Sequence, residues 1–298
     1  MGLVDKENDG RREWQREFEW DKDVQDANKL IFENEEFREN QREIINCTKS
    51  GRDVLALIPT GGGKSLTFQL SAVTDPGVTF VVMPLLSLIE DNLNFVTNLG
   101  IPACTLSTVS NSKNEKARIS EYYRMIEQVE FKIVYLTPER INNSPGLLQI
   151  ISALHSKGLV SRFVIDEVHC VSHWGQDFRK DYLELKVLRS KYPGVPILGL
   201  TATATVRVKE DICKQLNLQD VVCFQSSFNR TNLIYEIRDK KQIKNVDSDI
   251  AQLLNTRFRG KCGIIYCVRR KECEQLSETL KRNFKIKCDF YHADMAYD

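Results

Sequence analysis

The chain has 298 residues, of which 42% are hydrophobic and 28% charged, a balance typical of a folded globular protein. Its formal net charge of +1 gives no general signal for nucleic acid, so a surface of that kind has to be a local patch. No apolar run approaches the ~20 residues that span a membrane. We therefore expect no membrane segment, and we do not expect the charged stretch 1–20 to be a secretory signal.

Residues 1–24 are predicted to form a charged N-terminal arm, which Trp14, Phe18 and Trp20 could partly dock. Between residues 25 and 227, short apolar runs alternate with segments of helical pattern, such as 114–127 and 206–216. The predicted strands are 51–57, 78–83, 132–136, 162–165 and 196–200. This alternation predicts an α/β fold, a parallel sheet with helices on both faces. Ligand-binding loops in such sheets lie at the carboxyl ends of the strands.

The pattern restarts after residue 227, with a predicted strand at 262–267, a helix at 271–280 and a strand at 286–291. Residues 228–298 are too few for a complete domain of this class, which needs about 100 or more. The sequence therefore predicts the beginning of a second, incomplete domain.

A glycine-rich loop follows the first predicted strand, in the sequence Thr60-Gly61-Gly62-Gly63-Lys64-Ser65. Such a loop presents backbone N–H groups to a phosphate chain at the start of a helix. Lys64 would supply a positive charge, and the Ser65 hydroxyl would help to hold Mg²⁺. Ile58 stands where the strict pattern has its first glycine, and the three consecutive glycines compensate in backbone freedom.

An acidic pair, Asp166 and Glu167, directly follows the predicted strand 162–165. Phosphoryl transfer depends mainly on positioning and charge neutralisation. Asp166 would support Mg²⁺, directly or through water, and Glu167 would polarise the attacking water. His169 lies two residues further on and is a candidate for the same site. The loop and the acidic pair, in this order, predict a nucleoside triphosphatase.

Asp166-Glu167-Val168-His169 and the glycine-rich loop together resemble a superfamily 2 helicase with a DExH box. Further segments resemble the RecQ family of DNA helicases, most of all its short eukaryotic RecQ1-type members. These segments are 37–41, 84–88, 135–140, 170–179, 200–205, 228–233 and 265–267. The resemblance runs from about residue 20 to the end of the chain and includes the family's aromatic-rich loop at 170–179.

The resemblance implies two RecA-like lobes, with ATP and Mg²⁺ as cofactors and single-stranded or partly duplex DNA as partner. It assigns Arg38 and Gln41 to the adenine, and Trp174, Phe178 and Arg179 to DNA. Aromatic side chains can stack on unpaired bases, each for about 1–3 kcal/mol. It also implies 3′ to 5′ translocation and work in the nucleus, in DNA repair and recombination. It names no protein partner.

The second RecA-like lobe is expected to be truncated at Asp298, before the motif that carries the family's arginine finger. Removing such a finger costs on the order of 10³–10⁵ in rate in related systems, so we expect weak turnover. Two alternatives stay open. One is a non-catalytic product that binds nucleotide and DNA, and the other is an RNA-directed helicase of the same superfamily, against which the loop 174–179 argues.

Overall fold

The structure is a computed structural model, which describes residues 9–106, 113–175, 177–227, 229 and 232–295. The chain divides into two compact units, Met1–Arg230 and Thr231–Asp298. No helix in the described ranges combines the length and the apolar character that crossing a bilayer requires.

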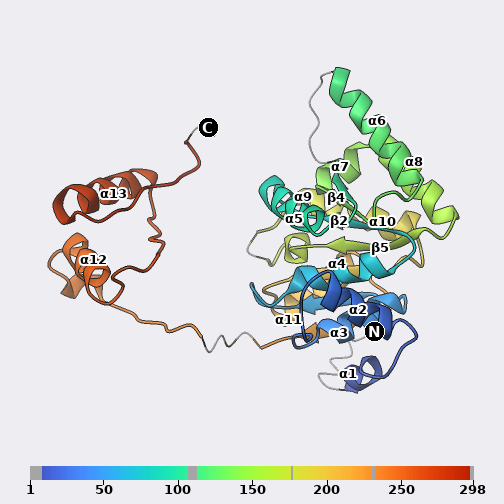
Figure 1. Ribbon diagram of the computed structural model, residues 1–298, viewed down its shortest axis with the longest axis horizontal. Coiled ribbons are helices and arrows are strands. Elements are labelled where there is room, and N and C mark those ends of the chain that lie inside the picture. The colour runs from blue at the N-terminus through green and yellow to red at the C-terminus, as the bar shows by residue number, and fades with distance from the viewer. Residues whose placement is uncertain (1–8, 107–112, 176, 228, 230–231, 296–298) are drawn as a thin grey trace. The chain divides into compact units, whose positions relative to one another are not determined.

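The first unit is built on a parallel sheet of seven strands, in the order β3-β4-β2-β5-β6-β1-β7. Figure 1 labels three of its central strands, β4, β2 and β5. The strands are β1 (Val54–Leu57), β2 (Val78–Val82), β3 (Ala103–Thr105), β4 (Ile133–Leu136), β5 (Val160–Ile165), β6 (Ile197–Thr201) and β7 (Val222–Gln225). Five of them lie where the sequence predicts strands. The other two, β3 and β7, are the edge strands. They are short and only partly buried, so they lack the continuous apolar run that marks a central parallel strand.

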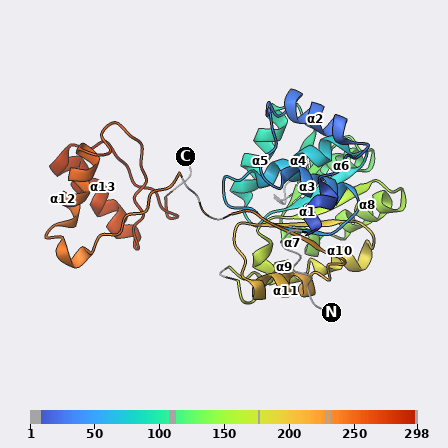
Figure 2. The same cartoon turned by 90° about the horizontal axis from the view of Figure 1, so that it is seen from below.

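Helices cover both faces of the sheet, as the sequence predicts, and Figure 2 shows α2 to α5 on one side and α9 to α11 on the other. The first face carries α1 (Asp9–Trp14), α3 (Gln41–Lys49), α4 (Lys64–Thr74) and α5 (Leu86–Asn98), with α2 (Asp21–Leu30) packed on α3 and α4. The second carries α6 (Lys113–Glu127), α7 (Pro138–Asn143), α8 (Pro145–Ser156), α9 (Lys180–Leu183), α10 (Lys186–Lys191) and α11 (Val206–Gln215).

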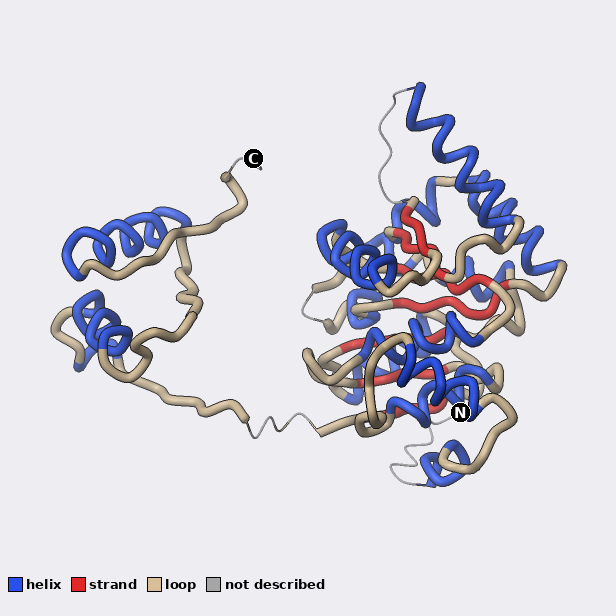
Figure 3. The backbone as a smooth tube through the Cα atoms, in the orientation of Figure 1, coloured by secondary structure: helices blue, strands red, loops and turns tan. Residues whose placement is uncertain are grey.

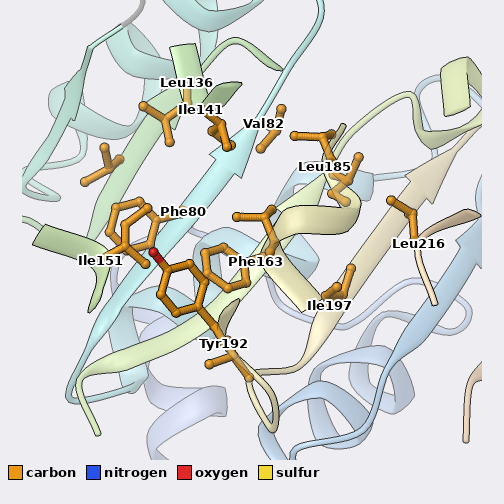
Figure 4. Close-up of a cluster of buried hydrophobic side chains, with 14 of the residues drawn as sticks. Phe80, Val82, Leu136, Ile141, Ile151, Phe163, Leu185, Tyr192, Ile197 and Leu216 are labelled. Atoms are coloured by element: carbon orange, nitrogen blue, oxygen red, sulfur yellow. The ribbon is translucent and has the colours of Figure 1, made fainter. Parts of the chain in front are cut away.

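Each central strand is buried on both sides because successive side chains point to opposite faces. In β1, Leu55 and Leu57 join the core under α8 to α11, whereas Val54 and Ala56 join the core under α3 and α4. Figure 4 shows part of the core under α8 to α11. There the ring of Phe163 lies 6.0 Å from that of Phe80 and 5.6 Å from that of Tyr192, centroid to centroid. This packing fixes the sheet whose carboxyl edge carries the site.

The segment predicted to be an N-terminal arm is anchored to α3 from Trp14 onward. Trp14 is buried in the core under α3 and α4. The Asn46 side chain donates to the Trp14 carbonyl oxygen at 3.0 Å and accepts from the Trp20 indole N–H at 2.9 Å. Phe18 stacks between the two indoles, with ring centroids 6.3 and 5.0 Å away. These contacts brace the helix that begins at Gln41.

The second unit consists of α12 (Val246–Asn255), α13 (Arg270–Phe284) and a 3₁₀ turn at Lys240–Gln242. Helix α13 lies over the predicted helix 271–280. The predicted strands 262–267 and 286–291 are wrong, since no strand forms within 232–295 (Figure 3). A strand is stabilised by hydrogen bonds to a neighbouring strand, and neither segment has one in the described part of this unit. Its assignment to a second RecA-like lobe stays a prediction.

Candidate active site

The sheet register brings the predicted site segments to one edge. Strand β6 lies between β1 and β5, with Leu57 paired to Thr201 and Ile165 paired to Gly199. The glycine-rich loop follows β1, the acidic pair follows β5, and Thr201 ends β6. Because the strands are parallel, their carboxyl ends open on the same side.

The glycine-rich loop runs too close to its neighbours for side chains at two positions. A Cβ on Gly62 would lie 2.5 Å from Ile58 Cγ2 and 2.9 Å from the Pro59 carbonyl oxygen. At Gly63, where φ is +85°, a Cβ would lie 2.3 Å from Gln41 Nε2. Gly63 caps α4, so Lys64 and Ser65 form its first turn. The loop thus ends at a helix N-terminus, which favours an anion.

Arg38 and Gln41 are both tied to the backbone of this loop. Arg38 donates through Nη1 to the Gly61 carbonyl oxygen at 2.6 Å, and Gln41 donates through Nε2 to that of Gly63 at 3.0 Å. Gln41 Oε1 also accepts from the Arg38 N–H at 2.8 Å. An amide has two N–H donors and two acceptor lone pairs, so Gln41 retains a donor and an acceptor for a ligand.

The carboxylate of Asp166 is buried and faces another acid. Its Oδ1 accepts from the Glu167 N–H at 2.9 Å, and the buried Tyr182 hydroxyl donates to the Asp166 carbonyl oxygen at 3.1 Å. Burial, followed by the charge of Glu167, raises the pKa of Asp166 to about 6. Glu167 has φ +47°, a rare backbone conformation for its type that occurs at functional sites.

His169 connects the acidic pair to the end of β6. Its Nδ1 lies 2.9 Å from Thr201 Oγ1 and 3.3 Å from Glu167 Oε2. Hydrogen bonds with Cys170 and Glu167 raise the pKa of His169, and the hydrogen bond with His169 lowers the pKa of Glu167. The Thr201 hydroxyl in turn donates to the Thr203 carbonyl oxygen at 3.1 Å. Glu167, His169 and Thr201 therefore form one hydrogen-bonded group.

The residues of this edge fit Mg²⁺ and a nucleoside triphosphate. The glycine positions give phosphate oxygens close access to the backbone. The Lys64 ammonium donates to the Ile58 carbonyl oxygen at 3.4 Å, so the cation lies beside this loop. Within the described ranges, no group of three or more His, Cys, Asp or Glu side chains could hold a metal alone. Ser65 and Asp166 would supply two oxygens, and Mg²⁺ characteristically takes its other ligands from phosphate and water.

The aromatic loop lies beside this group. Trp174 is 57% exposed and Phe178 37% exposed, but the two rings have different partners. Phe178 stacks on His173 at 3.9 Å between centroids. Trp174 lines a pocket of about 360 Å³ together with His169, Gly175, Thr203, Ala204, Thr205 and Val208. The pocket therefore joins an exposed aromatic ring to His169, which contacts Glu167.

Arg179 is already engaged by the protein. It donates through Nη1 to the Pro84 carbonyl oxygen at 3.0 Å and through Nη2 to Asp177 at 2.9 Å. Its own N–H donates to the Cys170 carbonyl oxygen at 3.0 Å. It therefore holds the aromatic loop against the segment after β2. Its contact with DNA stays a prediction.

Several residues of the site were not singled out from the sequence. Thr201 belongs to the segment 200–205 of the family resemblance, which does not reveal its hydrogen bond with His169. Asn40 has φ +67° and donates to Ser226 Oγ at 2.9 Å, next to the end of β1. Arg207 and Asp211 of α11 contact the aromatic loop. Asparagine tolerates positive φ, but no local pattern points to its distant partner.

Residues 38–212 match the family model described as DEAD/DEAH box helicase. The match covers the glycine-rich loop, the acidic pair and the aromatic loop. The chain belongs to the DEAD/DEAH box helicase family. The matched region of this helicase chain therefore includes both Arg38, at the glycine-rich loop, and Asp211, at the aromatic loop.

Similar proteins narrow the relationship within the helicases. The chain is 44% identical to ATP-dependent DNA helicase Q-like 4B of Arabidopsis thaliana, over 99% of the chain and 25% of that relative. It is 38% identical to ATP-dependent DNA helicase Q1 of Rattus norvegicus, over 95% of the chain and 45% of the relative. With RecQ-like DNA helicase BLM of Xenopus laevis it shares 43% identity, over 87% and 19%. The resemblance to the RecQ family is thus confirmed, and the chain spans less than half of these relatives.

The fold also has a solved counterpart. The crystal structure of the DUF1998 helicase MrfA superposes with a TM-score of 0.61 at 14% sequence identity, covering 88% of this chain and 41% of that one. At this identity the likeness concerns the fold alone. It agrees with the predicted RecA-like parallel sheet.

Proposed function

We propose that this chain is the nucleotide-binding part of an ATP-dependent DNA helicase of RecQ type, which moves 3′ to 5′ along single-stranded DNA in the nucleus. Lys64 and the loop 60–65 hold the phosphates, while Ser65 and Asp166 support Mg²⁺. Arg38 and Gln41 contact the adenine, and Trp174, Phe178 and Arg179 meet DNA. The family membership and the relatives named as DNA helicases support this proposal.

One observation carries the coupling between ATP and DNA. Glu167, His169 and Thr201 are linked by hydrogen bonds, and His169 also lines the pocket that holds Trp174. A base that shifts Trp174 therefore acts on a residue in direct contact with the proposed water-activating acid.

Bound Mg²⁺ would neutralise phosphate charge and polarise the bond to be broken. The other contributions come from the side chains of this site. The Lys64 ammonium offsets negative charge beside Asp166 and Glu167. Glu167, kept ionised by His169, is suited to accept a proton from the attacking water. Arg38 and Gln41 keep the loop in shape through Gly61 and Gly63.

The test measures nucleotide affinity, DNA affinity and hydrolysis on the same purified chain. We expect Lys64→Ala to abolish binding of a fluorescent ATP analogue with Mg²⁺ and to leave oligo-dT binding intact. Lys157→Ala, at an exposed lysine after α8, is the charge-matched control. We expect Trp174→Ala to weaken oligo-dT binding by roughly 5- to 150-fold, the equivalent of one lost stacking contact, with nucleotide affinity unchanged.

The outcomes separate the alternatives. Hydrolysis stimulated by oligo-dT and lost in Lys64→Ala supports the enzyme, and unwinding of a duplex with a 3′ tail but not a 5′ tail supports the direction. Binding of both ligands without hydrolysis favours a non-catalytic role. Stronger stimulation by oligo-rU than by oligo-dT favours RNA. Failure to bind nucleotide at all contradicts the proposal.

A further inference from the structure

Helix α11 presents two side chains, one turn apart, to the aromatic loop. The guanidinium carbon of Arg207 lies 3.2 Å from the centroid of the Trp174 ring. Four residues later, Asp211 Oδ2 accepts from the Ser172 hydroxyl at 2.6 Å. Residues spaced by four share a helix face. One face of α11 therefore contacts the loop at its base and at its exposed ring.

The contact with Arg207 occupies a face of Trp174 that a nucleobase could also use. A guanidinium and a base are both attracted to the π-face of an indole. They cannot lie on the same face at one time. Arg207 is exposed, so its side chain is free to leave for solvent when a base arrives.

The contact with Asp211 fixes the start of the loop. Ser172 is fully buried, and its Oγ accepts from the Trp174 N–H at 3.2 Å. The Ser172 N–H donates to the His169 carbonyl oxygen at 3.0 Å. Asp211 thus holds a residue that is hydrogen-bonded to both Trp174 and His169.

We propose that Arg207 and Asp211 form a latch on the aromatic loop, in which Arg207 covers Trp174 until a base of single-stranded DNA takes its place on the ring. The latch rests on the proposed DNA function and adds a step to it. Asp211 keeps the base of the loop in position, so that replacement of Arg207 reorients Trp174 against His169 instead of loosening the whole loop.

The test compares the complete chain with its Arg207→Ala variant on two oligonucleotides of equal length, oligo-dT and an abasic strand. A cation–π contact at an exposed site changes a binding constant by about two- to five-fold. Competition from Arg207 should weaken the binding of a base to Trp174 by the same factor. We therefore expect Arg207→Ala to bind oligo-dT about two- to five-fold more tightly relative to the abasic strand. Lys214→Ala, which removes an exposed cation two turns along α11, is expected to leave the ratio unchanged.

Salt dependence distinguishes a latch from a simple phosphate contact. If Arg207 binds phosphate, its removal weakens both strands equally and lowers the slope of log affinity against log salt by about 0.7, which overturns the latch. An unchanged ratio at wild-type affinity overturns the latch alone. If the wild-type chain binds neither strand, the proposed DNA function fails and the latch fails with it.

A measurement on the protein alone tests the Asp211 contact. Trp14 is buried and Trp20 half-buried, so iodide quenching reports mainly on Trp174. We expect Asp211→Ala to increase quenching, because Ser172 loses its anchor, while Glu210→Ala at the neighbouring exposed position does not. Equal quenching in the two variants contradicts the role of Asp211, and circular dichroism verifies that both are folded.

Discussion

The two ends of one sheet place an aspartate in opposite electrostatic surroundings. At the amino ends of the strands, Asp75 pairs with Arg162 and Lys49; burial raises its pKa, but these two cations more than offset that effect and lower it. At the carboxyl ends, burial and Glu167 raise the pKa of Asp166 to about 6. The fold supplies the charge partners of the first aspartate and leaves the second for a cation to neutralise.

Hydrogen bonds also hold Arg162 at the amino end. Arg162 is 1% exposed, and besides Asp75 it donates to Thr48 Oγ1 at 3.2 Å and to Thr79 Oγ1 at 3.3 Å. The carboxyl end instead carries Glu167 with positive φ and an open pocket. The amino end thus supplies cations that balance the charge of Asp75, whereas the carboxyl end leaves the charge of Asp166 unbalanced. Substitutions at either end of the sheet test this contrast.

The largest effect is expected from Asp75→Asn. It leaves the Arg162 guanidinium buried without its carboxylate, which typically costs about 3–5 kcal/mol. Because the pKa of Asp75 is lowered in the folded chain, its contribution is present above the unfolded value near 4 and is lost as pH falls further. Urea unfolding at neutral pH measures the loss.

A surface pair gives the matched control. Asp26 lies 3.2 Å from Lys22 at exposed positions one turn apart on α2. Exposed pairs contribute about 0–1 kcal/mol, so Asp26→Asn is expected to change stability by no more than that. If Asp75→Asn were as mild as the control, the amino end would not be the electrostatic anchor of the sheet.

Asp166→Asn is expected to stabilise the chain in Mg²⁺-free buffer. A pKa raised from 3.8 to about 6 opposes ionisation in the folded state by up to about 3 kcal/mol at neutral pH. The sign follows from proton binding: between about pH 4 and 6 the folded state holds the proton and the unfolded state does not, so stability falls as pH rises. An asparagine at this position does not ionise, so it contributes no change of stability with pH.

Thermal unfolding between pH 4 and 7 measures this difference. Wild type should lose stability relative to Asp166→Asn across the window, while adding Mg²⁺ and nucleotide should stabilise wild type more than the variant. Destabilisation by Asp166→Asn at pH 7 without Mg²⁺ would show that its carboxylate already has a partner in the fold, as Asp75 does.

The carboxyl end could be predicted from sequence far better than the amino end. Its loop and acidic pair are contiguous motifs that follow apolar strands, so their positions came directly from chain order. At the amino end, Arg162 and Asp75 lie 87 residues apart. The same difficulty arises at the carboxyl end for Asn40 and Ser226, which lie 186 apart. Such pairs depend on strand order in the sheet, which no local pattern specifies.

Strand prediction failed for a related reason. The apolar run 262–267 has the composition of a strand, yet it forms none, whereas the three-residue β3 forms at the edge by pairing with β4. Pairing decides whether an apolar segment becomes a strand, and pairing is a long-range property. The contact of Arg207 with Trp174 cannot be predicted locally for the same reason, since the two residues come from separate elements.

The smallest change in stability, and the most local, is expected from Gly63→Ala. An alanine at φ +85° costs about 1–2 kcal/mol in backbone strain. Its Cβ would also meet Gln41 Nε2 at 2.3 Å, and Gln41 is 2% exposed and held by Arg38 and by Gly63 itself. Gln41 has to move, and the phosphate loop loses a hydrogen bond. We expect nucleotide affinity to fall about ten-fold or more.

Gly51→Ala separates the strain from the contact. Gly51 has φ +80°, nearly the same as Gly63, but an added Cβ would meet nothing within 4 Å. The two variants should therefore lose similar stability in urea unfolding, and only Gly63→Ala should lose affinity for an ATP analogue in a binding titration. Equal nucleotide affinities would mean that Gln41 moves without consequence, and that the carboxyl end tolerates a displacement of the side chain that holds its phosphate loop.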